Sequence, residues 1–163
     1  MALVGIIGKK REIQSIKKEL ANEKVEVIQI NKQSIKNIKS VFFEYLVIIE
    51  DINLDENEYQ YMKNLISKAN YLIINADIEI KCLKYINIEN PVKIITFGFN
   101  AKSTITVSSV NDEKILVCLQ RSIKNFKNEI VEEQEKEIKV TENYTRKVHS
   151  KLVVFIIKEL HNI

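Results

Sequence analysis

Two glycines followed by basic residues are the first residues whose types could do chemistry, in the segment "GIIGKK". A triphosphate-binding loop has the pattern G-x-x-x-x-G-K-[ST], which supplies backbone amides, a lysine for the outer phosphates and a hydroxyl for magnesium. Here only two residues separate Gly5 from Gly8, and Lys10 stands where the hydroxyl should be. The dinucleotide pattern G-x-G-x-x-G is also absent. We therefore interpret the segment as the first strand and turn of an α/β domain, in which Gly8 makes the turn and Gly5 eases helix packing.

Acidic and amide side chains follow the third and fourth strands expected along the chain. Glu50, Asp51 and Asp55 come after one apolar run, and Asn75 and Asp77 come at the end of the next. Ligands bind at the carboxyl edge of a doubly wound sheet, where paired carboxylates could hold a magnesium ion. We favour another interpretation, in which Asp55 and Asp77 accept hydrogen bonds from free backbone N–H groups and cap the helices that follow.

Nucleophilic and metal chemistry have little support in the residue spacing. Both histidines, His149 and His161, lie in the last expected helix, and their separation of twelve positions is too long for a helical metal pair. We expect each of them on the surface. Cys82 and Cys118 belong to no motif and sit among apolar residues, so we expect buried small hydrophobes in a reducing compartment. The sequence has no G-x-S-x-G, and we expect no catalytic residue and no metal site.

The bulk composition is that of an ordinary globular domain. The chain has 163 residues, 45% hydrophobic and 29% charged, with a net charge of +3, which predicts one domain and neither nucleic acid nor membrane as a partner. Residues 1–40 hold nine basic and four acidic side chains. We interpret this excess as a solvated face, because the lysines follow helical periods without aromatic residues between them. No apolar run approaches the roughly 18 residues of a membrane helix, and no signal peptide is evident, so we expect a cytoplasmic protein.

Short apolar runs alternate with helical patterns through residues 1–100, as in parallel strands joined by crossover helices. Only three glycines and one proline interrupt the chain, which favours regular elements joined by short loops. The expected strands cover 2–7, 25–30, 44–51, 70–77 and 92–99. The expected helices cover 9–22, 56–69 and 80–86, with a weaker helix through Ile35 and Ile38. Right-handed crossovers then predict a three-layer, Rossmann-like, mostly parallel sheet with helices on both faces.

The period of the pattern changes after Gly98. The alternation in 103–123 predicts an antiparallel β-hairpin with a polar turn at "NDEK". Residues 129–140 fit either a helix or an exposed edge strand, and the ending "EIKV" favours a strand. The segment 141–163 predicts a helix whose apolar face either closes the core or serves for association; this face comprises Val148, Leu152, Phe155, Ile156 and Leu160. The parallel units (1–100), the antiparallel extension (101–140) and this helix fit one domain over 1–163.

The segments "DINLDENEYQYMKNLISKANYLIINADIE" and "PVKIITFGFNAKSTITVSSV" carry short motifs in a definite order. The motifs are Leu54-Asp55, Tyr61 with Lys63, Asn75-Ala76-Asp77 and Thr96-Phe97-Gly98. Over roughly residues 41–120, this order resembles the central domain of the Mur ligases and their folylpolyglutamate synthetase relatives. In that family an Asp-His-Leu-Asp segment, a "NADD" strand end and a "TFG" strand end lead to a hairpin and a helix. The resemblance implies that Asn75 and Asp77 lie near the position of a nucleotide base.

The departures from this family concern its chemistry. The ligases couple ATP to amide-bond formation, and they need a phosphate loop, magnesium ligands and a separate amino-acid-binding domain. Here the loop is shortened, Asn53 replaces the histidine of the Asp-His-Leu-Asp segment, and no length remains for a substrate domain. We therefore expect no ligase catalysis.

These residues leave two hypotheses about function. In the first, the chain is a non-catalytic, Mur ligase-like binding or regulatory module, with cell-wall biology as one candidate context, that contacts a protein partner or a second copy and holds no cofactor. In the second, it is a small nucleotide- or metabolite-binding protein or enzyme that uses the carboxyl edge of the sheet. Weak ATP or ADP binding, if it persists, would use Gly8, Lys9, Asn75 and Asp77.

Overall fold

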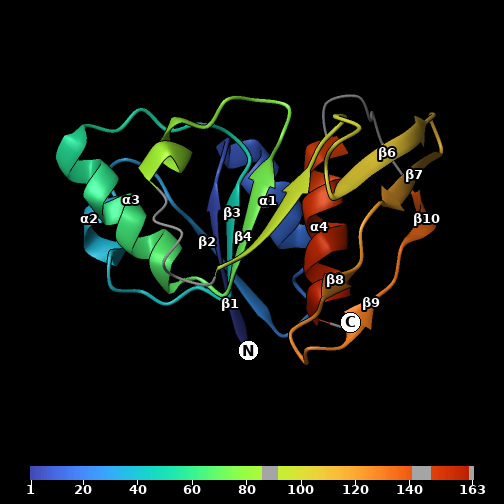
Figure 1. Ribbon diagram of the computed structural model, residues 1–163, viewed down its shortest axis with the longest axis horizontal. Helices are drawn as coiled ribbons and strands as arrows, with labels where there is room; N and C mark the ends of the chain where they lie inside the picture. Colours follow the sequence, from blue (N-terminus) through green and yellow to red (C-terminus); the bar gives the residue numbers. More distant parts are fainter. Residues whose placement is uncertain (86–91, 141–147, 162–163) are drawn as a thin grey trace.

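The computed structural model describes residues 1–85, 92–140 and 148–161, apart from the side chains of Cys82 and Tyr85, and it is drawn in Figure 1. Its helices are α1 (Lys10–Glu19), α2 (Ile35–Ile38), α3 (Glu56–Lys68), the 3-10 helix η1 (Lys81–Tyr85) and α4 (Val148–His161). Its strands are β1 (Ala2–Ile7), β2 (Val25–Gln29), β3 (Tyr45–Ile48), β4 (Tyr71–Asn75), β5 (Lys93–Phe97), β6 (Ile105–Val110), β7 (Lys114–Leu119), β8 (Ile123–Lys124), β9 (Ile130–Val131) and β10 (Gln134–Lys139).

Eight of these strands form one mostly parallel sheet, in the order β10-β7-β6-β5-β4-β3-β1-β2. Strands β1 to β6 run parallel to one another, and β7 and β10 extend the sheet in antiparallel fashion. Strands β8 and β9 form a separate antiparallel ribbon. Every residue of β3 and β4 is buried, as in strands that are covered on both faces. The predicted α/β fold class is confirmed.

Two hydrophobic cores lie on opposite faces of this sheet, because successive side chains of a strand point to opposite sides. In β3, Tyr45 and Val47 belong to the core that α1 and α4 cover. Leu46 and Ile48 belong to the core that α2 and α3 cover. Figure 1 shows α3 and α4 on opposite sides of the central strands, so helices cover both faces, as predicted.

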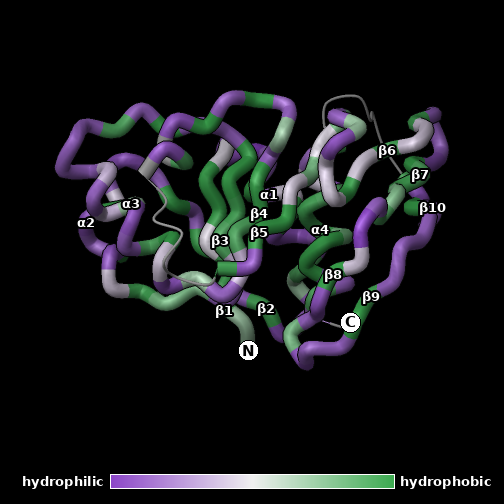
Figure 2. The backbone as a smooth tube through the Cα atoms, viewed as in Figure 1, coloured by the Kyte–Doolittle hydropathy of each residue, from purple (hydrophilic) through white to green (hydrophobic). Residues whose placement is uncertain are grey.

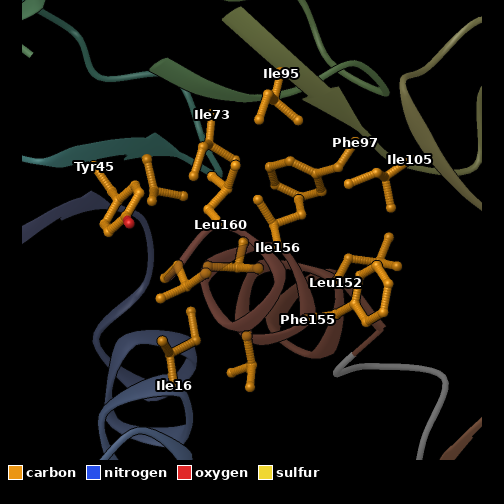
Figure 3. Close-up of a cluster of buried hydrophobic side chains, with 14 of the residues drawn as sticks. Ile16, Tyr45, Ile73, Ile95, Phe97, Ile105, Leu152, Phe155, Ile156 and Leu160 are labelled. Atoms are coloured by element: carbon orange, nitrogen blue, oxygen red, sulfur yellow. The ribbon is translucent and has the colours of Figure 1, made fainter. Parts of the chain in front are cut away.

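The last helix, α4, is buried on nearly all sides. Its predicted apolar face lies in the core, and so do Val153, Val154 and Ile157 outside that face. Figure 2 shows hydrophobic residues concentrated in the central strands and in α4. Figure 3 shows Leu160 and Ile156 of α4 pointing toward Ile73 and Phe97 of the sheet, and Leu152 pointing toward Ile105. Of the two interpretations of this helix, closing the core is correct, because its apolar face is not exposed for association.

The antiparallel extension clarifies the ambiguous segment 129–140. It forms β9 and the edge strand β10, which pairs with β7. Ile138 packs against the α4 core, and Lys136 lies on the same face with its Nζ 5.9 Å from the Phe155 ring centroid. The alternation of inward and outward residues therefore favours the strand over the helix. The predicted hairpin 103–123 ends earlier than expected, since Ile123 belongs to β8 and not to β7.

Several local predictions need adjustment. The expected helix 80–86 is the short 3-10 helix η1, with Ile86 outside the described residues. Gly5 faces the side chains of Ile30 and Phe43, and not a helix: a Cβ would lie 2.7 Å from Ile30 Cδ1 and 2.9 Å from the Phe43 ring.

Cys118 is a free, half-buried thiol, and the prediction for the Cys82 side chain lies outside the described residues. Within the described ranges, no helix has the length and apolar character needed to cross a membrane.

Candidate functional site

The strand order reverses at β1, which lies between β2 and β3. The chain reaches β2 through α1 on one face and reaches β3 through α2 on the other face. In such sheets the carboxyl ends of the strands at this reversal are the usual place for a ligand. Gly8 and Lys9 follow β1, and Glu50 and Asp51 follow β3. The structure thus brings the predicted residues Gly8, Lys9 and Glu50 together at the carboxyl ends of β1 and β3.

The charges at this reversal point balance one another. Lys9 Nζ lies 2.7 Å from Glu50 Oε1, and the hydrogen bond and charge of Glu50 raise the pKa of Lys9 above its ordinary value. The backbone N–H of Lys9 donates to Glu12 Oε2 at 3.4 Å. The N-terminus of a helix favours a phosphate or another anion, but at α1 the carboxylates of Glu12 and Glu50 already supply the negative charge.

Gly8 is needed at this point because of a close approach. A Cβ on Gly8 would lie 3.2 Å from Ile49 Cβ and 3.6 Å from Glu12 Oε2. Its φ lies outside the left-handed region, which Gly98 alone occupies among the glycines. Gly8 therefore allows the end of β1 to lie against the end of β3, and the reason for the glycine is space and not an unusual turn conformation.

Asn75, predicted as a nucleotide contact, is 3% exposed and bonded within the protein. Its Nδ2 donates to the carbonyl oxygen of Ile49 at 2.9 Å, and its Oδ1 accepts the N–H of Asp77 at 3.0 Å. The side chain thereby joins the end of β4 to the end of β3.

Asp77 does not cap a helix, so this prediction is wrong. Its carboxylate oxygens accept the backbone N–H groups of Phe99 at 2.9 Å and Asn100 at 3.0 Å. Gly98 adopts φ 146°, and a Cβ there would lie 2.6 Å from the Asp77 carboxylate. The positive φ and the close approach both require glycine at this position. Asp77 thus organises the turn that follows β5, more than twenty residues away in sequence.

His149 completes this cluster, which the sequence reasoning missed. Its Nε2 lies 2.7 Å from Asp77 Oδ2, and its side chain is 28% exposed, not fully on the surface as predicted. The imidazole ring packs edge-on against Phe97 and Phe99, with centroid distances of 6.0 and 5.6 Å. The near-continuous apolar character of α4 could have indicated the position of His149. A deeply buried helix lies along the sheet, so its first turn lies against the edge of the sheet.

Hydrogen bonds determine the ionisation of Asp77. Burial opposes the charged carboxylate, but the bond to His149 and the backbone N–H groups of Phe99 and Asn100 together outweigh burial. The pKa of Asp77 is therefore below its ordinary value, as expected for a carboxylate that accepts several hydrogen bonds.

A second polar cluster lies at the opposite, amino edge of the sheet. His161, at the end of α4, contacts the hydroxyl of Tyr45 through Nδ1 at 3.2 Å, and its ring lies 5.6 Å from that of Phe126. Burial, followed by the charge of the chain's amino terminus, lowers the pKa of His161. Burial also raises the pKa of the Tyr45 hydroxyl. This histidine too is half-buried, contrary to the prediction.

The remaining predicted acids have structural partners. Asp55 caps α3 as predicted: its Oδ1 accepts the N–H of Glu58 at 2.9 Å, and Glu58 Oε2 accepts the N–H of Asp55 at 2.9 Å. Asp51 Oδ1 accepts the N–H of Lys81 at 3.2 Å, at the start of η1. Among the described side chains, no three His, Cys, Asp or Glu residues gather in a way that could hold a metal ion.

Searches against family models and against curated proteins found no match to this chain.

Proposed function

We propose that this chain is a non-catalytic α/β binding module, similar to a reduced Mur ligase central domain, that works by contacting a protein partner. The observation that carries the proposal is the state of the polar groups at the carboxyl edge. Lys9 is paired with Glu50, Asn75 is bonded to Ile49 and Asp77, and Asp77 is bonded to two backbone N–H groups and His149. The three side chains predicted to meet a nucleotide, those of Lys9, Asn75 and Asp77, thus already have partners in the protein.

The electrostatics of the reversal point support the same proposal. A phosphate at the N-terminus of α1 would have to displace the Glu12 carboxylate from the Lys9 N–H and compete with Glu50 for the Lys9 ammonium. Like charges at such short separations disfavour the charged ligand. A triphosphate carries several negative charges, so its repulsion by Glu12 and Glu50 opposes its attraction to Lys9.

A thermal-unfolding assay with ATP or ADP, with and without magnesium, tests this proposal. At a hundredfold excess over its dissociation constant, a true ligand stabilises by about 2.7 kcal/mol, and we expect no shift of the unfolding temperature. A shift with any of these nucleotides would overturn the proposal in favour of the nucleotide-binding hypothesis.

A matched pair of variants identifies the cause of the exclusion. The variant Glu12→Gln/Glu50→Gln lacks the local negative charge. We therefore expect it to bind ATP more tightly than the wild type does, as measured by the shift of the unfolding temperature. The control, Glu132→Gln/Glu133→Gln, makes the same change of net charge at two exposed acids beside β10. The unfolding temperature of the control should respond to ATP as that of the wild type does.

A further inference from the structure

We infer that the outer edge of β2 binds an extended, acidic segment of a partner protein by strand addition. The inference rests on the proposed function, that the chain works by binding a protein. Two features support this: outward backbone groups of β2 that have no partner among the residues the structure describes, and an excess of exposed basic side chains in residues 1–40.

The hydrogen-bond pattern of β2 leaves its odd-numbered residues facing outward. Strand β2 is the last in the sheet order, and β1 is its neighbour. The N–H of Ala2 donates to the carbonyl of Lys24 at 2.8 Å, and the N–H of Ile30 donates to the carbonyl of Ile6 at 2.8 Å. Because alternate residues of a parallel strand bond to the same neighbour, the even-numbered residues of β2 form the hydrogen bonds to β1. The N–H and C=O groups of Val27 and Gln29 therefore point away from the sheet.

The other edge of the sheet is protected against such pairing. Strand β10 carries side chains of alternating charge that form ion pairs with neighbouring residues of the same chain. Lys114 pairs with Glu137 at 2.8 Å, and Lys136 pairs with Glu159. Charged side chains of this kind are a common way to prevent edge-to-edge association. Strand β2 carries one charged residue, Glu26, among Val25, Val27 and Ile28.

The charges around β2 fit an acidic segment. All nine basic residues of 1–40 are exposed, whereas Glu26 is exposed and the other three acids are half-buried. Two of these three are held by α4, through Lys151–Glu19 at 2.8 Å and Lys158–Glu23 at 3.2 Å. The third, Glu12, accepts the Lys9 N–H at the start of α1. Two of the nine basic residues have acidic partners outside this segment, Lys9 with Glu50 at 2.7 Å and Lys32 with Glu58 at 3.1 Å. Seven other exposed basic side chains remain in residues 1–40, against the one exposed acid, Glu26.

Helix α1 places part of this charge beside the edge. One flank of α1 packs toward α4 through Glu19, and α1 also lies over β2. At 100° per residue, Lys10, Gln14 and Lys17 lie on the opposite flank from Glu19, and all three are exposed. An added strand beside β2 would pass below this flank, so glutamate or aspartate at alternate positions of the added strand would meet these lysines.

Peptide binding with hydrogen exchange tests the inference. The probe is a fluorescently labelled peptide of about eight residues, in which glutamate alternates with threonine or valine, and its counterpart has lysine in place of glutamate. We expect the acidic peptide to bind, the lysine peptide not to bind, and the affinity to fall with added salt. We also expect the amide protons of Val27 and Gln29 to become protected from exchange, because main-chain hydrogen bonds form in strand addition.

Two sets of variants make the test specific to the edge. Gln29→Pro removes an outward N–H and, on an edge strand, spares the bonds to β1; we expect about tenfold weaker peptide binding, whereas Gln29→Ala keeps the N–H and the affinity. The variant Lys10→Glu/Lys17→Glu should also bind the acidic peptide more weakly than the wild type. The control Lys102→Glu/Lys127→Glu should keep the affinity, because it makes the same charge change at exposed lysines elsewhere. Circular dichroism confirms that each variant is folded.

Several outcomes would overturn the inference. Peptide binding that Gln29→Pro leaves unchanged would place the site elsewhere and leave the proposed function intact. Equal binding of single-stranded DNA, also unaffected by Gln29→Pro, would make the surface a general anion surface. A dimer in light scattering that Gln29→Pro dissociates would make a second copy the occupant. A nucleotide-induced thermal shift, in contrast, would overturn the proposed function itself.

Discussion

At the scale of single residues, Asp77 joins three segments that are distant in sequence. It follows β4, it accepts the backbone N–H groups of Phe99 and Asn100 after β5, and it contacts His149 in α4. The absence of a Cβ on Gly98 makes room for the carboxylate. A short polar side chain therefore fixes both a turn and the position of a buried helix.

Asp77→Asn should lower the free energy of unfolding at pH 7 by about 1–3 kcal/mol. The amide has one acceptor oxygen in place of two, and its N–H₂ group faces the backbone N–H groups that the carboxylate accepts. Urea unfolding measures the change, and Asp112→Asn, at an exposed turn, should change the stability by less than about 0.5 kcal/mol. Equal effects of the two substitutions would contradict the role of Asp77.

The lowered pKa of Asp77 predicts how this contribution depends on pH. A carboxyl with a lowered folded-state pKa stabilises the protein above its unfolded-state pKa of about 3.9, and the stabilisation is lost as the pH falls through the folded-state value. The difference between wild type and Asp77→Asn should therefore be present at about pH 5 and shrink as the pH falls below about 4. A difference that persists undiminished in stronger acid would be inconsistent with this linkage.

His161 predicts a second pH dependence of stability, which arises from burial and not from hydrogen bonds. Burial lowers its pKa, so the folded state binds a proton less readily than the unfolded state. Stability should then decline as the pH falls below about 6.5, the ordinary value for histidine. In His161→Gln, which keeps a polar group near the Tyr45 hydroxyl, this part of the decline should be missing. Urea unfolding at a series of pH values checks it, and identical pH profiles for the two proteins would show that His161 is not the cause.

At the scale of elements, α4 is the main support of one face of the sheet. A helix of 14 residues spans about 21 Å, and α4 runs from His149 at the carboxyl edge to His161 at the amino edge. Between these ends it is buried against the sheet and α1 (Figure 3). Strand β2, in contrast, is the last strand of the sheet, and we propose that the partner binds at its outer edge.

Ile156→Ala should destabilise the protein by about 2–5 kcal/mol, because the fully buried side chain leaves a cavity among packed neighbours. Ile130→Ala is the matched control, since Ile130 is 61% exposed, and it should cost less than about 0.5 kcal/mol. Chemical denaturation measures both. A small effect at Ile156 would mean that α4 is packed more loosely than the structure shows.

At the scale of the whole molecule, residues far apart in the chain share one core. Side chains from β3, β4 and β5 form the floor of the core that α4 covers, among them Tyr45, Ile73 and Phe97. Without the last helix, α1 is the helix of the parallel units 1–100 that covers this face, and the part of the face under α4 would be exposed. The domain depends on its C-terminal helix to complete this layer beside α1.

A chain that ends at Val140 should lose cooperative unfolding. Removal of α4 would expose the apolar floor around Tyr45 and Phe97, and a sheet needs that face buried. We expect a broad urea transition and binding of a hydrophobic dye, and both should be reversed when residues 141–163 are added as a separate peptide. A sharp two-state transition for the shortened chain would show that the parallel units fold without their second layer.

The order of amino acids is sufficient to predict the class of fold and most local structure. A β-branched run such as 44–51 is stable only between two layers, and the spacing of Ile13, Ile16 and Leu20 predicts one buried stripe on a helix. The cap of α3 is equally predictable, because Asp55 and Glu58 are three positions apart and bond within one turn. These features depend on neighbours within a few residues, so a local pattern contains the information.

The polar contacts of the carboxyl edge and the free edge of β2 depend on the packing of the whole chain. Asp77 meets His149, and Lys9 meets Glu50, only because of the strand order and the length of sheet that α4 covers. Those distances result from the simultaneous burial of both faces of the sheet, and no short run of residues encodes them. For the same physical reason, Asp77 looks like a helix cap in the sequence but joins a turn to a helix in the folded protein.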